Sequence, residues 1–457
     1  MRYIFIIFLI SASLIASAQK EDYVWIFGGN KVDFSSNPPS VTAVGDFVTD
    51  RNISSVCDSK GNLCYWCSGR YLYNRNNGVI LGTGDVGHGQ CLETLSIVPF
   101  PASDRMFLYA YIDQLNEKVR FALIDGSRDL DHPDVTNDYF SLPYGFAAGG
   151  GLPVFIQKRN SRNMWMLHDY DGEVTVYLIS GKGFEKLGTY QRPDTGNWQD
   201  TVPWQAYFVD NDNSKILCDI IYDLENPKYQ YVEFDNASGE ISKMTIIETL
   251  DYIMFCQFSP NGKYMYYTFS SDDETRSKRI YRCPTSRIDG TSSSLRRYSE
   301  YVHEAPDYMW DIKTAPDGNI YFIYNKCNSL GVIRNPDDAA PVIEDNYLAL
   351  AQPFPTQEMV VIFTHTYHHN LSVVCRISCT QASFQCLEDG VVGYEWDFGD
   401  GGAISTDAEP VHDYPDFGDY DLHLRITYSD HSHRDIYQTV SVANMLKKPV
   451  VRWEMKD

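Results

Sequence analysis

The sequence predicts an all-β protein, in which a seven-bladed β-propeller over residues 19–368 is followed by an immunoglobulin-like β-sandwich over residues 372–443. Two observations lead to this prediction. The composition combines 33 Tyr, 23 Phe and 8 Trp with 31 Gly and 21 Pro, which is typical of many short strands joined by tight turns. Units of a turn followed by a strand also recur with a mean spacing of about 51 residues, which matches one four-stranded blade.

The repeat is clearest in two segments of the same design. Phe258–Tyr267 and Thr314–Phe322 each contain a Pro-Asx-Gly turn followed by an alternating aromatic strand. Similar turns mark six units, centred on residues 61, 116, 172, 213, 262 and 318. A seventh blade follows if Tyr23–Phe27 pairs with strands near Met359–Phe363, because this pairing removes the open edge of the array. The alternative is two stacked β-sandwiches, which would not explain so long a repeat.

Residues 1–18 have the parts of a cleavable signal peptide. A single Arg precedes an apolar run from Tyr3 to Ile10, and Ala16-Ser-Ala18 stands directly before Gln19. We therefore expect the mature chain to begin at Gln19 and to be exported to the extracellular space, the cell surface or the periplasm. A short membrane anchor is the alternative, but the apolar run is shorter than the ~20 residues that a spanning helix needs.

The acidic balance of the chain excludes some classes of partner. There are 61 Asp and Glu against 38 Lys and Arg, a net charge of −23, which nucleic-acid phosphates and anionic bilayers would repel. We expect no nucleic-acid partner and no transmembrane segment, and instead an extracellular glycan or protein ligand. The 11 Cys are an odd number, so at least one thiol is free or pairs between chains. Cys379 and Cys386 flank a short loop and are the predicted disulfide.

No motif in the sequence carries a known catalytic chemistry. A Gly-x-Ser-x-Gly elbow, a His-Glu-x-x-His helix, Walker-type glycines and Asp-box turns are all absent, so we assign no catalytic residue, no metal ligand and no cofactor. The most suggestive binding stretch runs from Arg192 to Trp204 and includes Trp198 and Asp200. Aromatic faces stack on sugar rings and Asp accepts hydrogen bonds from hydroxyls, which makes Trp198, Asp200 and Trp204 the predicted ligand-binding residues. Packing of one or both Trp between blades is the alternative.

Three segments near the carboxyl terminus share the pattern of one known domain. They are Tyr394–Gly401, Pro410–Tyr414 and Gly418–Ile426. Together they resemble a PKD domain almost segment by segment, which implies an immunoglobulin-like sandwich. In this domain Trp396 is the large buried aromatic, Asp397, Gly399 and Asp400 form a tight turn, and Tyr420 lies in a half-buried strand. Calcium beside the two Asp is one interpretation of the turn, and capping of backbone N–H groups is the other.

The amino-terminal region also resembles a known group. The segments Trp25–Phe34, Cys57–Leu63 and Tyr73–Arg75 look like the propeller region of secreted, PKD-containing surface proteins of Bacteroidetes-type bacteria. The two resemblances imply a non-catalytic module of adhesion or surface assembly, followed by a tail over residues 444–457. The sequence thus predicts a secreted or cell-surface binding protein that recognises glycans or proteins through its propeller, with the PKD domain as spacer or interaction module.

The competing class is a propeller-type polysaccharide hydrolase or lyase that carries the PKD domain as an accessory module. Carboxylate pairs abound in so acidic a chain, so choosing a glycosidase pair from the sequence would be arbitrary. A cluster of carboxylates with an Arg or Tyr at the mouth of the central channel would favour the enzyme. A channel lined by small and apolar side chains would favour the binding protein.

Overall fold

The structure of the chain is a computed structural model. It describes residues 20–45, 53–58, 60–69, 71–82, 92–101, 103, 105–113, 116–144, 153–158, 161, 163–193, 207–209, 215–221, 228–248, 252–270, 278–288, 295, 297–353, 373–378, 380–386, 391–428 and 433–442. The predicted signal peptide, residues 1–18, and the tail, residues 444–457, lie outside these ranges. The chain divides into two compact units, one over Gln19–His368 and one that contains His369–Asp457. Within the described ranges, no helix has the length and apolar character needed to cross a membrane.

The first unit consists of antiparallel sheets whose strands follow one another in chain order. The first sheet has three strands, β1 (Val24–Phe27), β2 (Asn30–Asp33) and β3 (Ser40–Ala43). Two four-stranded sheets follow, made of β4 (Ile53–Cys57), β5 (Leu63–Ser68), β6 (Tyr71–Asn74) and β7 (Val79–Gly82), and of β8 (Leu92–Pro99), β9 (Met106–Asp113), β10 (Lys118–Asp125) and β11 (Asp134–Pro143). Each sheet is therefore an up-and-down meander, the form of a propeller blade.

Four more sheets of four strands complete this unit. The first two are made of β12 (Val154–Gln157), β13 (Met164–Tyr170), β14 (Glu173–Ser180) and β15 (Gly183–Gln191), and of β16 (Tyr207–Val209), β17 (Lys215–Ile221), β18 (Lys228–Asp235) and β19 (Glu240–Glu248). The last two are made of β20 (Tyr252–Phe258), β21 (Tyr264–Ser270), β22 (Arg279–Pro284) and β23 (Glu300–Glu304), and of β24 (Met309–Thr314), β25 (Ile320–Tyr324), β26 (Ser329–Arg334) and β27 (Val342–Ala349). A short 3-10 helix, Thr285–Arg287, follows β22.

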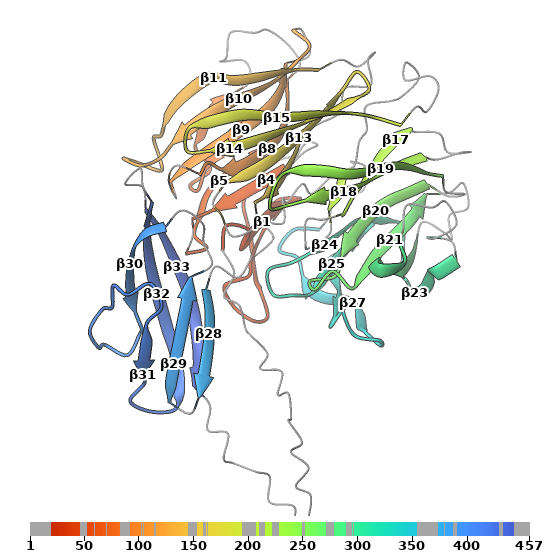
Figure 1. Cartoon of the computed structure of the whole chain (residues 1–457). Helices are drawn as coiled ribbons and strands as arrows, with labels where there is room; N and C mark the ends of the chain where they lie inside the picture. Colours follow the sequence, from red (N-terminus) through yellow and green to blue (C-terminus); the bar gives the residue numbers. More distant parts are fainter. Residues whose placement is uncertain are drawn as a thin grey trace, which may run out of the picture. The chain divides into compact units, whose positions relative to one another are not determined.

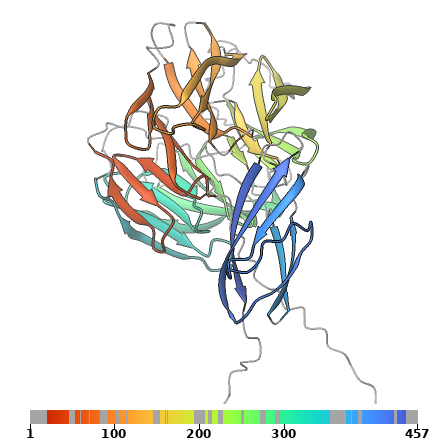
Figure 2. The same cartoon turned by 90° about the vertical axis from the view of Figure 1, so that its left-hand side faces the viewer.

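The sheets are arranged in a closed ring. First strands of successive sheets lie side by side, as β4 does with β8 and β20 with β24. The first and last sheets also meet, because Trp25 and Phe34 pack against the ring of Tyr321 with centroids 6.2 and 5.6 Å away. Asn30 Nδ2 donates to the carbonyl of Gln352 at 3.0 Å, and the Gln352 N–H donates to Asn30 Oδ1 at 2.8 Å. This ring of sheets is a β-propeller (Figures 1 and 2), which confirms the predicted fold class.

Each of the six turns singled out in the sequence falls in a different four-stranded sheet. Those at 61, 213, 262 and 318 join first and second strands, whereas those at 116 and 172 join second and third strands. This difference explains why their spacing is uneven although the sheets are equivalent. The glycines among them, Gly61, Gly172, Gly262 and Gly318, have φ between 65° and 89°, a region that residues with a Cβ rarely adopt.

The direction of β1 indicates its place in the first sheet. The Cys57 N–H donates to the Glu21 carbonyl at 2.7 Å, so β1 begins beside the end of β4 and runs opposite to it. This is the direction of the second strand in the other blades, so β1 takes the second position in its own blade. Among the described residues, no strand fills the first position beside β1. The predicted partner of Tyr23–Phe27, Met359–Phe363, lies outside the described residues. That pairing, and with it the exact number of seven blades, stays a prediction.

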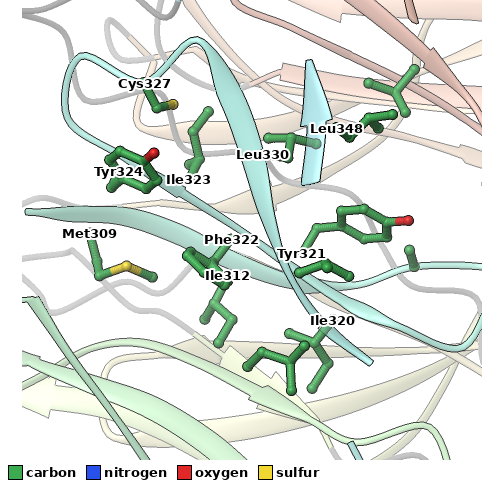
Figure 3. Packing of buried hydrophobic residues seen from close by; sticks show 14 of the residues in the cluster. Met309, Ile312, Ile320, Tyr321, Phe322, Ile323, Tyr324, Cys327, Leu330 and Leu348 are labelled. Carbon is green, nitrogen blue, oxygen red and sulfur yellow. The ribbon is translucent and has the colours of Figure 1, made fainter. Parts of the chain in front are cut away.

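The boundaries between neighbouring sheets are filled by apolar side chains. The largest cluster joins the last sheet to the first, and Figure 3 shows its members around β24 and β25, among them Ile312, Tyr321 and Phe322. Gly331 in β26 lies directly against Phe322 in this cluster. A Cβ at this position would come within 2.2 Å of the Phe322 ring carbons, so only glycine allows the two strands to pack this closely.

The second unit is a sandwich of two three-stranded sheets. One sheet contains β28 (Val373–Ser378), β29 (Gln381–Cys386) and β31 (Val411–Asp413), and the other contains β30 (Val391–Asp397), β32 (Gly418–Tyr428) and β33 (His433–Val442). Trp396 is 0% exposed in the core between them, as predicted, and its Nε1 donates to the Asp407 carbonyl at 2.9 Å. The Tyr420 hydroxyl donates to the Asp416 carbonyl at 2.9 Å, a bond of the kind that fixes corners in immunoglobulin-like sandwiches.

The hairpin of β28 and β29 contains one partner of the predicted disulfide. Cys386 pairs with Val373, whereas Ser378 pairs with Gln381 at the other end of the hairpin. Cys379 lies outside the described residues, so the Cys379–Cys386 disulfide stays a prediction.

Candidate functional site

The three predicted ligand-binding residues, Trp198, Asp200 and Trp204, lie outside the described residues, so their role stays a prediction. The chain that leads into them is described up to residue 193. The Arg192 N–H donates to the Gly172 carbonyl at 2.9 Å. The Arg192 guanidinium forms an ion pair with Asp169 in which both side chains are buried. This buried pair fixes the base of the predicted binding stretch to the end of β13.

Buried polar groups gather at the same end of the propeller. The second strands of all sheets run in the same direction. They therefore finish on the same side of the ring, which is also where the third strands begin. Seven side chains of the described residues at this end have a buried polar atom with neither a hydrogen-bond nor an ion-pair partner. We call them the polar end: Ser68, Tyr111, His168, Gln230, Thr268, Trp310 and Asn325. Trp25, Tyr65 and Ser96 also carry such an atom, but they lie elsewhere along their strands.

The side chains of the polar end lie on the same strand faces as the apolar side chains that fill the boundaries between sheets. Tyr111 belongs to the cluster between the sheets β4–β7 and β8–β11. His168 follows Met166 on the same face of β13, and Met166 belongs to the next cluster, between β8–β11 and β12–β15. Gln230 lies on the same face of β18 as Val232, which belongs to the cluster between β12–β15 and β16–β19. Successive boundaries thus change from apolar to polar towards one end of the molecule.

His168 is held as a neutral acceptor. It is 2% exposed, and burial lowers its pKa to about 4. Its ring is hydrogen-bonded to the backbone of Pro143, which has no N–H, so Nδ1 donates to the carbonyl. In the neutral ring Nε2 then carries the lone pair, and it has no partner. The half-buried ring of Tyr170 lies parallel to it, with centroids 6.1 Å apart.

Tyr111 offers a buried hydroxyl beside a tightly bonded ion cluster. It is 1% exposed, and burial raises its pKa to about 12. Arg120 Nε donates to Asp113 Oδ2 at 2.7 Å, and its Nη1 contacts Asp138. Burial by itself raises the pKa of Asp113, but the hydrogen bonds from Asn116 and Arg120 outweigh this and lower it. Asp113 therefore stays ionised, and the two carboxylates of the cluster share the single positive charge of Arg120.

This ion cluster bears on the choice between enzyme and binding protein. Carboxylates, an Arg and a Tyr do occur together at the polar end, as the enzyme hypothesis requires. However, Asp113, Arg120 and Asp138 belong to the second, third and fourth strands of their sheet, β9, β10 and β11, and not to the first strand beside the centre of the ring. Both carboxylates are also taken up by Arg120. The arrangement is that of a structural ion cluster.

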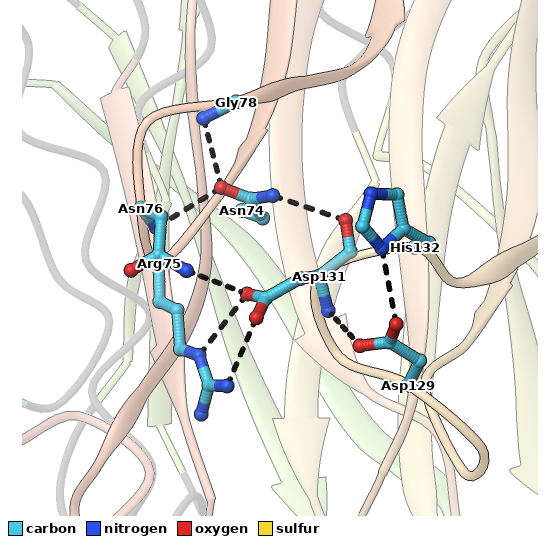
Figure 4. Close-up of polar contacts among 7 residues, drawn as sticks. All are labelled: Asn74, Arg75, Asn76, Gly78, Asp129, Asp131 and His132. Atoms are coloured by element: carbon cyan, nitrogen blue, oxygen red, sulfur yellow. Dashed lines mark hydrogen bonds and ion pairs between the residues drawn. The ribbon is translucent and has the colours of Figure 1, made fainter.

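A second polar cluster lies at the opposite end of the sheets and was not predicted from the sequence. Arg75 Nε and Nη2 each donate to the Asp131 carboxylate at 3.1 Å, and Asn76 Nδ2 donates to it at 2.9 Å (Figure 4). Asn74 Nδ2 donates to the Asp131 carbonyl at 3.0 Å. These bonds join the turn after β6 to the connection between β10 and β11. Because its acceptors are occupied within the chain, this cluster links two blades and offers little to a ligand.

The PKD turn follows the capping interpretation. Asp397 Oδ1 accepts from the Gly399 N–H at 3.0 Å, and Asp400 Oδ1 accepts from the Gly402 N–H at 2.9 Å. The second oxygen of Asp400 lies 2.8 Å from His412 Nε2. Across the ranges given above, no three His, Cys, Asp or Glu side chains come together in a way that could hold a metal ion. Calcium at this turn stays an untested alternative.

The two units correspond to a β-propeller and an immunoglobulin-like domain, and comparison with known proteins identifies the second. Residues 374–443 match the family model of the PKD domain. The PKD1 domain of the Vibrio cholerae metalloprotease PrtV is 29% identical, covering 16% of this chain and 93% of that chain with a TM-score of 0.15. The chain thus ends in a PKD domain, as its sequence predicts.

Similarity over the propeller is more distant. A protein from Lactobacillus plantarum is 9% identical and covers 71% of this chain and 93% of that chain, with a TM-score of 0.45. An oligogalacturonate lyase in complex with manganese is 12% identical and covers 65% and 78%, with a TM-score of 0.40. No curated protein matches the chain. The resemblance to surface proteins of Bacteroidetes-type bacteria therefore stays a prediction.

Proposed function

We propose that this chain is an exported binding protein that recognises an extracellular glycan or protein at the polar end of its propeller. The PKD domain then acts as a spacer or interaction module. The observation that carries the proposal is the gathering of seven buried polar atoms without partners at one end. Leaving a buried donor or acceptor without a partner costs about 1–3 kcal/mol. Such groups are normally satisfied by ordered water or by a ligand.

The location of the polar end supports recognition there. The stretch predicted to bind ligand starts from Arg192 at this same end, where its buried pair with Asp169 anchors it. Fourth strands also end here, so the connections between blades start and finish at this end. Connections between elements can vary without disturbing the sheets, and they commonly carry binding residues. The opposite end is occupied by clusters such as Arg75 with Asp131, whose groups are satisfied within the chain.

The proposal is tested by screening the mature chain against a glycan array and by pull-down from extracellular protein mixtures, followed by calorimetric titration of any hit. We expect stoichiometric binding without turnover of the ligand. Cleavage of a bound polysaccharide, seen as new reducing or unsaturated ends, would establish the hydrolase or lyase alternative instead. Failure of every glycan and protein probe to bind would remove the proposal altogether.

A further inference from the structure

We infer that the propeller carries a second binding site, away from the polar end, at which Arg287 and Arg297 hold an acidic polysaccharide. Both arginines belong to the connection between β22 and β23. Third strands begin at the polar end, so this connection lies at the opposite end of its sheet. Residues 278–298 contain six Lys or Arg and one Asp, which sets them apart in a chain with a net charge of −23. The site goes beyond the proposed function, because it uses none of the residues of the polar end.

The two arginines converge on one aromatic side chain. The guanidinium carbon of Arg287 lies over the ring of Tyr298 at 5.1 Å from its centroid, and that of Arg297 lies at 5.6 Å. Their separation cannot exceed the sum of these two distances, so one chain-like ligand can contact both. Both arginine side chains are exposed, and a ligand therefore reaches them on the surface without entering a cavity.

The positive charges of Arg287 and Arg297 are not neutralised by any carboxylate of the described residues. Glu300, which lies two residues after Tyr298, forms its ion pair with Arg282. Seven other arginines of the propeller do pair with a carboxylate: Arg75, Arg120, Arg128, Arg192, Arg279, Arg282 and Arg334. A chain with 61 Asp and Glu has enough carboxylates to pair two more. The two charges are therefore left available for an anionic group outside the chain.

The backbone that presents the two arginines is anchored in the core of the sheet. Ile288 directly follows Arg287 and is 5% exposed, and Leu295 lies two residues before Arg297 and is 4% exposed. Both belong to the apolar cluster of this sheet, and Tyr298 packs against the same cluster. Because the chain and the supporting ring are already fixed, a ligand that binds here orders little more than the two side chains themselves.

The chemistry of guanidinium groups and the net charge of the chain together define the class of ligand. A guanidinium group forms two parallel hydrogen bonds with a carboxylate or a similar oxyanion. DNA carries one negative charge per about 1.7 Å of its axis, and an anionic bilayer is a broad charged surface, so the net charge of −23 repels both. An acidic polysaccharide is a narrow chain with charges spaced along it. At physiological ionic strength screening acts over about 8 Å, so such a chain interacts with Arg287 and Arg297 and little with distant carboxylates.

The experiment titrates the mature full-length chain with oligogalacturonate and with a sulfated galactan oligosaccharide, which distinguish carboxylate from sulfate as the anion. The methyl ester of oligogalacturonate is the uncharged counterpart and should not bind. We expect Arg287→Gln and Arg297→Gln each to weaken binding of the acidic oligosaccharide about 10-fold, the effect of one lost hydrogen bond to a charged group. Arg105→Gln is the matched control and should bind as the unchanged chain does. Arg105 is also exposed and has no carboxylate partner among the described residues, but it lies between β8 and β9 of another sheet.

Several outcomes would overturn the inference. Absence of binding to both acidic oligosaccharides would do so, and so would full affinity in Arg287→Gln and Arg297→Gln. Equal weakening by Arg105→Gln would reduce the effect to the overall charge of the chain. Binding of DNA or of anionic phospholipid vesicles through the two arginines, without binding of either oligosaccharide, would show that the class of ligand is wrong.

The inference and the proposed function fail separately. Exchange of residues 194–206 for a Gly-Ser linker changes a connection at the polar end and should leave binding of the acidic oligosaccharide unchanged. Loss of this binding in the exchange variant would place the anion at the polar end and overturn the inference. Binding that depends on Arg287 and Arg297, with no ligand found for the polar end, would support the inference and count against the proposed function.

Discussion

Replacement of Trp396 by alanine tests the division of the chain into two independent cores. The Trp396 ring is 0% exposed and packs against Phe384, with ring centroids 5.7 Å apart. Its Nε1 bond to the Asp407 carbonyl ties the loop between β30 and β31 to the core. Removing a fully buried Trp costs about 3–5 kcal/mol, and the carbonyl that loses its donor adds about 1 kcal/mol.

A cost of this size is close to the whole stability of a small domain, which is about 5–10 kcal/mol. At roughly 4–8 °C per kcal/mol for a domain of this length, the melting temperature of the PKD domain should fall by about 15–50 °C. Differential scanning calorimetry of the full chain measures this, because each unit with its own core gives its own transition. The propeller transition and ligand binding by the propeller should be unchanged.

Trp165→Ala is the reciprocal control, because it removes a buried Trp from the core of the propeller. It is 2% exposed in the propeller, and its Nε1 donates to the Asn236 carbonyl at 2.9 Å, so the two tryptophans match in burial and bonding. Trp165→Ala should lower the propeller transition and leave that of the PKD domain in place. If Trp396→Ala lowered both transitions together, the two cores would not be independent. If it left both unchanged and abolished partner binding, Trp396 would be a recognition residue and not a core residue.

Three further predictions address export, acid stability and packing. N-terminal sequencing of exported protein should return Gln19, and recovery of Met1 would contradict the predicted signal peptide. Burial by itself raises the pKa of Asp400, but the hydrogen bonds from Gly402 and His412 outweigh this effect. The pKa of Asp400 is therefore lower in the folded than in the unfolded chain. The stabilisation that ionised Asp400 gives the folded PKD domain is present above the unfolded pKa and is lost as pH falls through the folded pKa. Asp400→Asn should therefore reduce the fall of the PKD melting temperature between neutral and acidic pH. Gly331→Ala should destabilise the propeller by about 1–3 kcal/mol in calorimetry, and an unchanged propeller transition would count against the close packing described.

Features of the fold that depend on local sequence were predicted well. A Pro-Asx-Gly turn with positive φ at Gly262 or Gly318 is decided by a few neighbouring residues. These two turns and the four similar ones located the six four-stranded sheets. The burial of Trp396 was likewise predicted, because the whole strand-turn pattern of the PKD domain surrounds it in sequence. The position of Cys386 opposite Val373 could not be predicted in this way, since it depends on the register of a hairpin and not on the length of a loop.

The polar end could not be predicted from the sequence because it is a property of the ring. In β9 and β13, Tyr111 and His168 look like ordinary members of buried strands. Their shared feature appears only when second strands of several sheets are brought to one end. One signal was present, since apolar second strands repeatedly finish on a polar residue, as with Ser68 and Asn325. This pattern of polar residues could be interpreted only with the knowledge of which turn in each repeat joins the second strand to the third.

The connections between sheets give a physical reason why recognition should lie at the polar end. Fourth strands end there and first strands begin there, so every link between sheets crosses this end. The links differ widely in length, from residues 305–308 between β23 and β24 to residues 192–206 between β15 and β16. At the other end, turns such as that at Gly318 are short and fixed by backbone geometry. A change in a link can alter this end of the propeller without moving the strands, whereas a change in a tight turn would strain the sheet itself. If the propeller binds its ligand at this end, exchanging residues 194–206 for a short Gly-Ser linker should therefore remove or change ligand preference while the melting temperature of the propeller falls little.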